Sequence, residues 1–163
     1  MADSWASSEA TRAVMRGNRS RDTNPELRVR RAVHALGLRY RVATRPLPGE
    51  RLTADLVFRR VKVAVFVDGC YWHGCPEHYR EARTNHEFWA TKIAANRARD
   101  LRANETLAAH GWLSLRVWEH DEPGAAAGLI AARVREREPP VRSHQGRGDA
   151  SAPPLRAGPS RSR

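Results

Sequence analysis

The segment VKVAVFVDGCYWHGCPEH, residues 61–78, joins an apolar run to a loop that is dense in chemically active side chains. Val61–Val67 is rich in β-branched residues, which fit the pleated surface of a sheet, so this run predicts a β-strand. The loop that follows contains both cysteines of the chain, two of its seven histidines and the adjacent aromatics Tyr71 and Trp72. The sequence therefore predicts a sheet strand that leads directly into a candidate functional loop.

Two further elements are predicted on the N-terminal side of this strand. A second apolar run, Asp55–Phe58, is separated from it only by Arg59 and Arg60, which predicts an antiparallel hairpin. Farther upstream, Thr23-Asn-Pro-Glu26 has the pattern of a capping box with proline in the first turn. This pattern, with Gly37 after the last apolar residue, predicts a helix.

Three more elements are predicted on the C-terminal side. Thr84-Asn-His-Glu87 repeats the capping-box pattern and opens a long helix that continues to about Ala109 and ends at Gly111. Residues 113–119 predict a third strand, and residues 124–137 predict a short alanine-rich helix. Strands mixed with helices in this order are typical of a small α/β domain.

The chain of 163 residues is long enough for one domain with its own core. We expect a flexible leader over residues 1–20, the domain over residues 21–137 and a disordered basic tail over residues 138–163. No apolar run is long enough to span a bilayer, and no signal peptide opens the chain. We therefore expect a soluble, cytoplasmic protein.

The chain is strongly basic, with 29 lysines and arginines against 18 acidic residues and a net charge of +11. Such an excess favours a polyanionic partner, and nucleic acid above all. Residues 123–163 carry eight basic and three acidic side chains, so we expect the tail to add non-specific attraction to DNA. The alternative is a compositional bias that spreads arginine over a solvated surface.

Cys70, Cys75 and His78 form a set of candidate metal ligands in one turn-rich loop. In a reducing compartment, cysteines so close in sequence are ligands or free thiols rather than a disulfide. A tetrahedral structural zinc site needs a fourth ligand. The best candidate is His120, at the end of the third predicted strand, and the competing candidate is His73, between the cysteines. The alternative is two buried thiols beside surface histidines.

Asp55 and Asp68 stand at the ends of the two hairpin strands. Carboxylates at strand ends serve as Mg²⁺ ligands in phosphodiester hydrolysis, provided that the register brings them together. Each aspartate taken alone is better explained as a turn or capping residue. Glu26 also has two interpretations, as a capping-box residue or as a contributor to the metal centre.

One face of the long predicted helix carries Trp89, Ile93, Asn96 and Asp100. This face should lie against the sheet, so Asp100 is placed to orient a histidine base such as His73. A salt bridge between Asp100 and Arg97 or Arg99 is the alternative.

Tyr71 and Trp72 are aromatic residues in a loop of a basic protein, where they can stack on bases or wedge between them. Adjacent residues in a loop do not readily bury in the same direction, which argues against a purely structural role for this pair. Trp89 is equally well explained as a core residue.

In this order, these residues resemble the very-short-patch-repair DNA mismatch endonucleases. The similarity spans roughly residues 10–135, and residues 63–78 form its most specific part. The segments that carry it are Arg21–Leu27, Gly37–Arg41, Leu47–Gly49, Ala54–Phe58, Val63–His78, Phe88-Trp89, Lys92-Ile93, Asn96, Arg99-Asp100 and Gly111–Glu119.

The resemblance implies a restriction-endonuclease-like core of the PD-(D/E)xK superfamily, in which helices flank a central mixed sheet. It implies a Mg²⁺-dependent enzyme that nicks one strand of duplex DNA on the 5′ side of the thymine in a T:G mismatch. Such mismatches arise when 5-methylcytosine deaminates. The implied partners are this duplex and mismatch-repair proteins, and the implied protein is a monomer at the bacterial nucleoid.

The resemblance also implies a role for each candidate residue. Asp55 and the backbone carbonyl of Val67 would bind Mg²⁺, and Glu26 would lie at the edge of the site. His73 would act as the general base, with Asp100 orienting it. The structural zinc ligands would be Cys70, Cys75, His78 and His120. The aromatic residues inserted beside the mismatch would be Tyr71, Trp72 and Trp89.

The chain departs from the family pattern around these sites. Ala54 replaces the proline that usually precedes the metal-binding aspartate, and the loop over residues 49–55 is longer. Asp68 stands where some members have histidine, so it either adds a metal ligand or changes only the charge of the site. His120 stands where cysteine is usual, and imidazole is a competent zinc ligand.

Two other functions fit the same residues. A nuclease of a restriction or defence system would cut matched or modified DNA with the same fold. A non-catalytic zinc-containing module would bind DNA without cutting it, but such a module has no need of the acid–base set.

Overall fold

The computed structural model describes residues 21–82 and 84–139. The leader predicted over residues 1–20 and nearly all of the predicted tail lie outside the described residues. The elements are α2 (Asn24–Ala35), β1 (Arg41–Thr44), β2 (Ala54–Phe58), β3 (Val63–Asp68), α3 (His86–Ala109), β4 (Leu113–Trp118) and α4 (Pro123–Glu136). None of the helices in this described part is long and apolar enough to cross a membrane.

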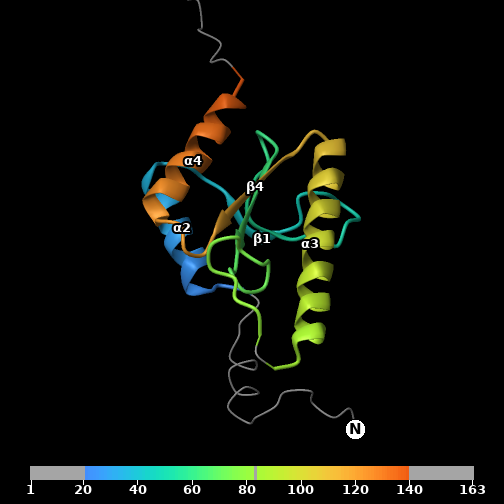
Figure 1. Ribbon diagram of the computed structural model, residues 1–163. Helices are drawn as coiled ribbons and strands as arrows, with labels where there is room; N and C mark the ends of the chain where they lie inside the picture. The colour runs from blue at the N-terminus through green and yellow to red at the C-terminus, as the bar shows by residue number, and fades with distance from the viewer. Residues whose placement is uncertain (1–20, 83, 140–163) are drawn as a thin grey trace, which may run out of the picture.

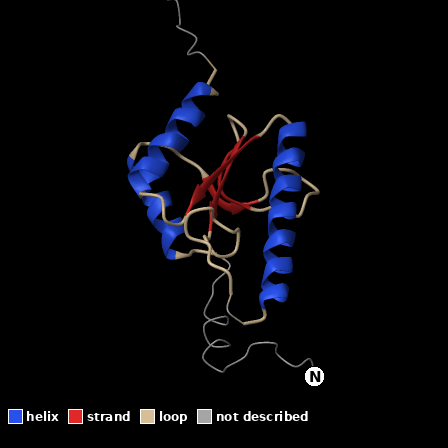
Figure 2. Ribbon diagram, viewed as in Figure 1, coloured by secondary structure: helices blue, strands red, loops and turns tan. Residues whose placement is uncertain are grey.

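The four strands form one mixed sheet between two layers of helices (Figure 1). The strand order is β1-β2-β3-β4; the first two pairings are antiparallel and β3 pairs with β4 in parallel. Helices α2 and α4 cover one face of the sheet and α3 covers the other (Figure 2). The prediction of an α/β fold with a mixed sheet flanked by helices is confirmed.

Both faces of the central strands are buried, which explains the continuous apolar run in the sequence. On β3, Val63 and Val65 belong to the core that is shared with α2 and α4. Ala64 and Phe66 point to the other face and join Leu107 of α3 in a second core cluster. The alternation follows the two-residue period of a strand, so each residue from Val63 to Val67 packs in one of the two core clusters.

The sequence-based element boundaries need three corrections. Strand β1 was not predicted, because Arg41–Thr44 is a short, half-exposed edge strand without an apolar pattern. The hairpin turn spans residues 59–62 rather than two residues, with Lys62 in the left-handed region at φ 53°. Thr23 makes no side-chain capping bond, so the first predicted capping box is wrong. The N-cap of α3 is Asn85, one residue after the predicted Thr84, and it makes no side-chain capping bond either.

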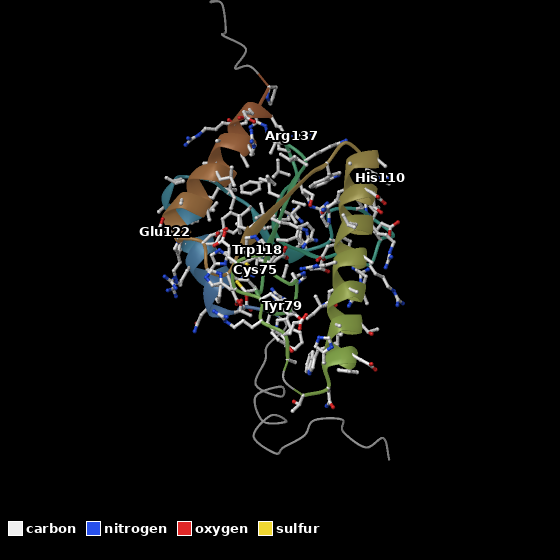
Figure 3. The ribbon with its side chains drawn as sticks, in the orientation of Figure 1. Cys75, Tyr79, His110, Trp118, Glu122 and Arg137 are labelled. Carbon is white, nitrogen blue, oxygen red and sulfur yellow. The ribbon has the colours of Figure 1, made fainter. Side chains whose placement is uncertain are left out.

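The two ends of the sheet carry different kinds of residue. Figure 3 shows Cys75 and Trp118 beside one another at one end, with His110 and Arg137 toward the other. At this second end, Arg137 donates to the carbonyls of Val61 and Gly111 at 2.9 and 2.6 Å, which ties α4 to the hairpin. The first end holds the candidate site.

The packing of α4 on the sheet predicts opposite outcomes for two neighbouring substitutions. The Ile130 side chain is fully buried in the core, whereas Leu129 is 45% exposed. Replacing Ile130 by Ala should lower the free energy of unfolding by about 2–5 kcal/mol, because it removes buried methyl groups and leaves a cavity. The Leu129→Ala control should change it by no more than about 0.5 kcal/mol. Urea denaturation measures both, and equal losses would contradict this packing.

Candidate active site

The hairpin register places Asp55 beside the end of β3. Leu56 pairs with Val65, and the Asp55 carboxylate accepts a hydrogen bond from the backbone N–H of Val67 at 2.7 Å. Burial raises the pKa of Asp55 to about 6, and the Val67 hydrogen bond opposes this shift. The charges of Glu26 and Asp68 raise the pKa further. Three carboxylates therefore act on one another at this end of the sheet.

The residues around Asp55 fit a hard divalent cation. Oxygen ligands are what Mg²⁺ prefers, and the half-buried Asp55 carboxylate is one such ligand. The same burial and neighbouring negative charges that raise the Asp55 pKa would favour an added positive ion. The register also brings the Val67 backbone to this carboxylate through its N–H, and the ligand predicted from the resemblance is the carbonyl oxygen of the same residue.

Glu26 is buried at the N-terminal end of α2, where it is held by several donors. Its carboxylate accepts from the backbone N–H of Asp22 at 2.9 Å and from the Thr23 hydroxyl at 3.0 Å, and it pairs with Arg30 at 2.8 Å. The attraction of the buried Arg30 side chain accounts for the failed capping box. The Glu26 charge contributes to the raised pKa of Asp55.

His73 and Asp100 are joined by a short hydrogen bond. The His73 Nδ1 atom lies 2.6 Å from one oxygen of Asp100, and the other oxygen lies 3.0 Å from Arg116 on β4. A carboxylate only accepts, so we assign the Nδ1 proton to His73. This tautomer leaves the Nε2 lone pair available as a base. The expectation that Asp100 contacts His73 agrees with this geometry.

The alternative salt bridges of Asp100 are not formed. Arg97 donates to the carbonyls of His73 and Gly74, and Arg99 donates to Asn96. Asp68, whose role the sequence left open, is buried and accepts from one nitrogen of Arg116 at 2.7 and 2.8 Å. Its position indicates that Asp68 acts as a partner of arginine.

The predicted zinc ligands converge from two distant segments. The ligand atoms of Cys70, Cys75, His78 and His120 all lie within 4.8 Å of one another. The Cys70 sulfur lies 3.0 Å from Nδ1 of His120, and the Cys75 sulfur lies 3.8 Å from Nδ1 of His78 and of His120. Tetrahedral zinc with bonds of about 2.3 and 2.1 Å separates sulfur and nitrogen by about 3.6 Å, so the donor set fits this ion.

The surroundings of the cluster also suit a metal. Nε2 of His120 faces Glu77 at 3.6 Å and Asp121 at 3.5 Å, and such outer carboxylates commonly orient a metal-binding imidazole. Burial, with the Cys75 thiol and the Glu119 carboxylate nearby, raises the pKa of Cys70 to about 12. A metal would therefore have to displace the thiol proton on binding.

Tyr71, Trp72 and Trp89 form one aromatic cluster. The ring centroid of Tyr71 lies 5.4 Å from that of Trp72 and 5.3 Å from that of Trp89. Trp89 is buried, as its core interpretation predicted, whereas the two loop aromatics are half-buried. Asn96 donates to the Trp72 carbonyl at 2.7 Å and so fixes the loop against α3.

Three site residues were not identified from the sequence: Arg116, Arg97 and Glu119. Arg116 is the single charged residue of the half-buried strand β4 and alternates with the core residues Leu115 and Val117, which is a usable signal. Glu119 accepts from the Cys70 backbone N–H at 2.7 Å. Gly74 stands in the left-handed region at φ 61°, and a Cβ there would collide with Arg97.

The similarity of the chain to known proteins covers much of the candidate site. The family model described as DNA mismatch endonuclease Vsr matches residues 3–79. The type II nicking enzyme V.NaeI of Lentzea aerocolonigenes is 46% identical over 126 residues, 76% of each chain. The type II nicking enzyme V.XorIIP of Xanthomonas oryzae pv. oryzae is 38% identical over 130 residues, 79% of this chain and 92% of the relative.

A third relative is itself named a DNA mismatch endonuclease. The DNA mismatch endonuclease Vsr of Escherichia coli K12 is 36% identical over 113 residues, 68% of this chain and 70% of the relative. With the site geometry, these relatives define the class: the chain is a DNA endonuclease with a mixed α/β fold. It belongs to the Vsr family, as its resemblance predicted. The alternative of a non-catalytic module is therefore set aside.

If the cluster of Cys70, Cys75, His78 and His120 binds zinc, the two candidate fourth ligands should give different results when they are replaced. The protein purified with zinc present should contain one zinc ion per chain, as measured by atomic emission. His120→Ala should lower this content and the thermal stability together, because a structural zinc contributes to folding. His73→Ala is the matched control from the same loop and should retain the metal. Zinc loss in the control with retention in His120→Ala would contradict the assignment.

The raised pKa of Asp55 predicts a stability change that depends on pH. A carboxyl with a pKa of about 6 when folded and 3.8 otherwise binds its proton more tightly in the folded state, so its ionisation opposes folding as pH rises. Asp55→Asn should raise the free energy of unfolding by about 2–3 kcal/mol at pH 7.5 without Mg²⁺, and by much less near pH 4.

The exposed loop residue Glu50 offers a matched carboxylate control for this measurement. Urea midpoints of Asp55→Asn and Glu50→Gln at both pH values separate the effect of burial from that of charge removal. A gain in Asp55→Asn that does not change between the two pH values would contradict the argument.

Proposed function

We propose that this endonuclease nicks one strand of duplex DNA on the 5′ side of the thymine in a T:G mismatch. The nick would begin very short patch repair of deaminated 5-methylcytosine. The observation that carries the proposal is the His73–Asp100 pair, with a separation of 2.6 Å, on the same sheet end as the half-buried Asp55. A base and a metal-binding carboxylate are the two parts that metal-assisted hydrolysis of a phosphodiester requires.

In this proposal, the residues of the chain have separate tasks. Asp55 and the Val67 backbone carbonyl would hold Mg²⁺, which when bound polarises the scissile phosphate. His73 would accept the proton of the attacking water at Nε2, while Asp100 holds the ring through Nδ1. Glu26 would tune the charge at the edge of the site. Zinc in the Cys70–His78 loop would be structural and hold the loop in place.

The aromatic cluster supports recognition of a weakened base step. Tyr71 and Trp72 are half-buried, lie in the loop beside His73 and contact each other and Trp89. Aromatic side chains that enter a base stack unstack a mismatched step at lower cost than a matched one. We infer that this cluster enters the duplex at the mismatch.

The remaining expectations belong to the same proposal. The antiparallel β2–β3 hairpin with Asp55 at its start, next to the parallel β4, supports a core of the PD-(D/E)xK type. We expect a monomer in the bacterial cytoplasm, at the nucleoid, which acts on DNA and in contact with mismatch-repair proteins.

A second candidate function is favoured by the names of the relatives. Two of the three relatives described above are named type II nicking enzymes, so a nuclease of a restriction system that nicks matched or modified DNA fits the same site. The substrate distinguishes the two candidates, because only the first requires a mismatch.

The nicking assay tests the proposal directly. A labelled duplex with one T:G mismatch, in several flanking contexts, should be nicked 5′ of the thymine when Mg²⁺ is present. Asp55→Ala and His73→Ala should each lower the rate about 100-fold or more, because a general base and a metal ligand contribute that much. His110→Ala is the matched control, since His110 lies at the opposite end of the molecule (Figure 3).

The matched T:A duplex completes the experiment. Absence of any nick at the mismatch in every context would contradict the proposed function. Equal rates on matched and mismatched duplexes would favour the restriction-type nuclease instead.

A further inference from the structure

Arg116 of β4 joins two carboxylates that come from different elements. Its guanidinium donates from one nitrogen to both oxygens of Asp68, at 2.8 and 2.7 Å. Its other terminal nitrogen lies 3.0 Å from Asp100 on α3. The guanidinium also lies 4.7 Å from the ring centroid of Phe66, on the neighbouring strand. The Arg116 guanidinium is thus held from three sides, next to the His73–Asp100 pair.

This arrangement determines which carboxylate accepts a hydrogen bond from His73. The His73 Nδ1 atom lies 2.6 Å from an oxygen of Asp100 and 3.9 Å from an oxygen of Asp68. Two carboxylates are therefore close enough to compete for its proton. Arg116 engages both oxygens of Asp68 and a single oxygen of Asp100. The second oxygen of Asp100 therefore remains directed at His73, in a fixed orientation.

These contacts to Asp68 and Asp100 require the two terminal nitrogens of an arginine side chain. A guanidinium presents donors on two terminal nitrogens in a rigid plane, whereas an ammonium is a single point charge. Lysine at position 116 could neutralise one carboxylate but could not hold both in the observed planes. The Asp68 side chain is only 6% exposed, so it has little access to water as a substitute partner.

We propose that Arg116 is a positioning residue for catalysis, and that Asp68 is its anchor. Arg116 keeps the Asp100 carboxylate in line with Nδ1 of His73 and keeps Asp68 away from that proton. This inference rests on the proposed function, because it assigns His73 the task of base. It gives Asp68 a role that is separate from metal binding.

Single-turnover nicking of the T:G duplex by Arg116→Lys and Arg116→Gln tests the inference. Both should react about 10- to 100-fold more slowly, while the Kd for the duplex stays within about twofold, because a misplaced base affects the reaction rather than binding. Asp68→Asn added to Arg116→Gln should restore part of the rate, since it removes the competing acceptor charge. Urea midpoints confirm that each variant is folded under the assay conditions.

A double-mutant cycle separates positioning from a general structural effect. In an Asp100→Asn background, Arg116→Gln should slow the reaction by less than about twofold, since residues that act as a unit are not additive. Arg133→Gln, on the exposed face of α4 in an ion pair with Glu136, should leave every rate unchanged. Multiplicative effects of the Arg116 and Asp100 substitutions would overturn the inference. A weaker Kd with an unchanged rate would also overturn it and would indicate a DNA contact.

A readout without DNA distinguishes this inference from the proposed function. The hydrogen-bonded Nδ1 proton of His73 should give a downfield NMR signal in the wild-type protein that is lost in Arg116→Gln. If the wild-type protein shows this signal but nicks no duplex, the proposed function fails, and loss of the signal in Arg116→Gln still shows that Arg116 positions the Asp100–His73 hydrogen bond. If the signal survives in Arg116→Gln, the positioning role fails.

Discussion

The parallel pairing of β3 with β4 is the constraint on which both candidate centres depend. It sets Phe66 opposite Arg116 and Asp68 opposite Trp118, so segments about 50 residues apart end at the same place. Because of this register, Arg116 reaches Asp68, and the turn after β4 reaches the cysteine loop. A shift by one residue would turn every side chain of β4 to the other face and would separate both sets.

The charges of the site are compensated in a way that suits its chemistry. Arg30 pairs with Glu26 and Arg116 pairs with Asp68 and Asp100, so two arginines contact three of the carboxylates and compensate part of their charge. Asp55 instead accepts a backbone N–H and remains near the other negative charges, with a raised pKa. An ionised group held in such surroundings lowers the stability of the domain, which is the usual cost of a binding site for a cation.

Much of the fold and part of the site could be predicted from the sequence, for physical reasons that are local. The β-branched run gave β3, proline and glycine limits gave the helices, and the spacing of Cys70, Cys75 and His78 indicated a metal site. The half-exposed β1 has no apolar pattern to reveal it. His120 was expected as the fourth ligand from its place at the end of the third predicted strand and from the family resemblance. The pairing of Asp68 with Arg116 depends on the β3–β4 register, which local sequence does not contain.

The central claim is that DNA, metal and base meet at the end of the sheet where Asp55 and His73 lie. A crystal structure of the protein with a T:G duplex and Ca²⁺ in place of Mg²⁺ tests this most directly, because Ca²⁺ binds oxygen ligands similar to those of Mg²⁺. The account predicts an ion on Asp55 and the Val67 carbonyl, with the scissile phosphate next to Nε2 of His73. A duplex bound at the opposite end of the sheet, or an ion held away from Asp55, would contradict it.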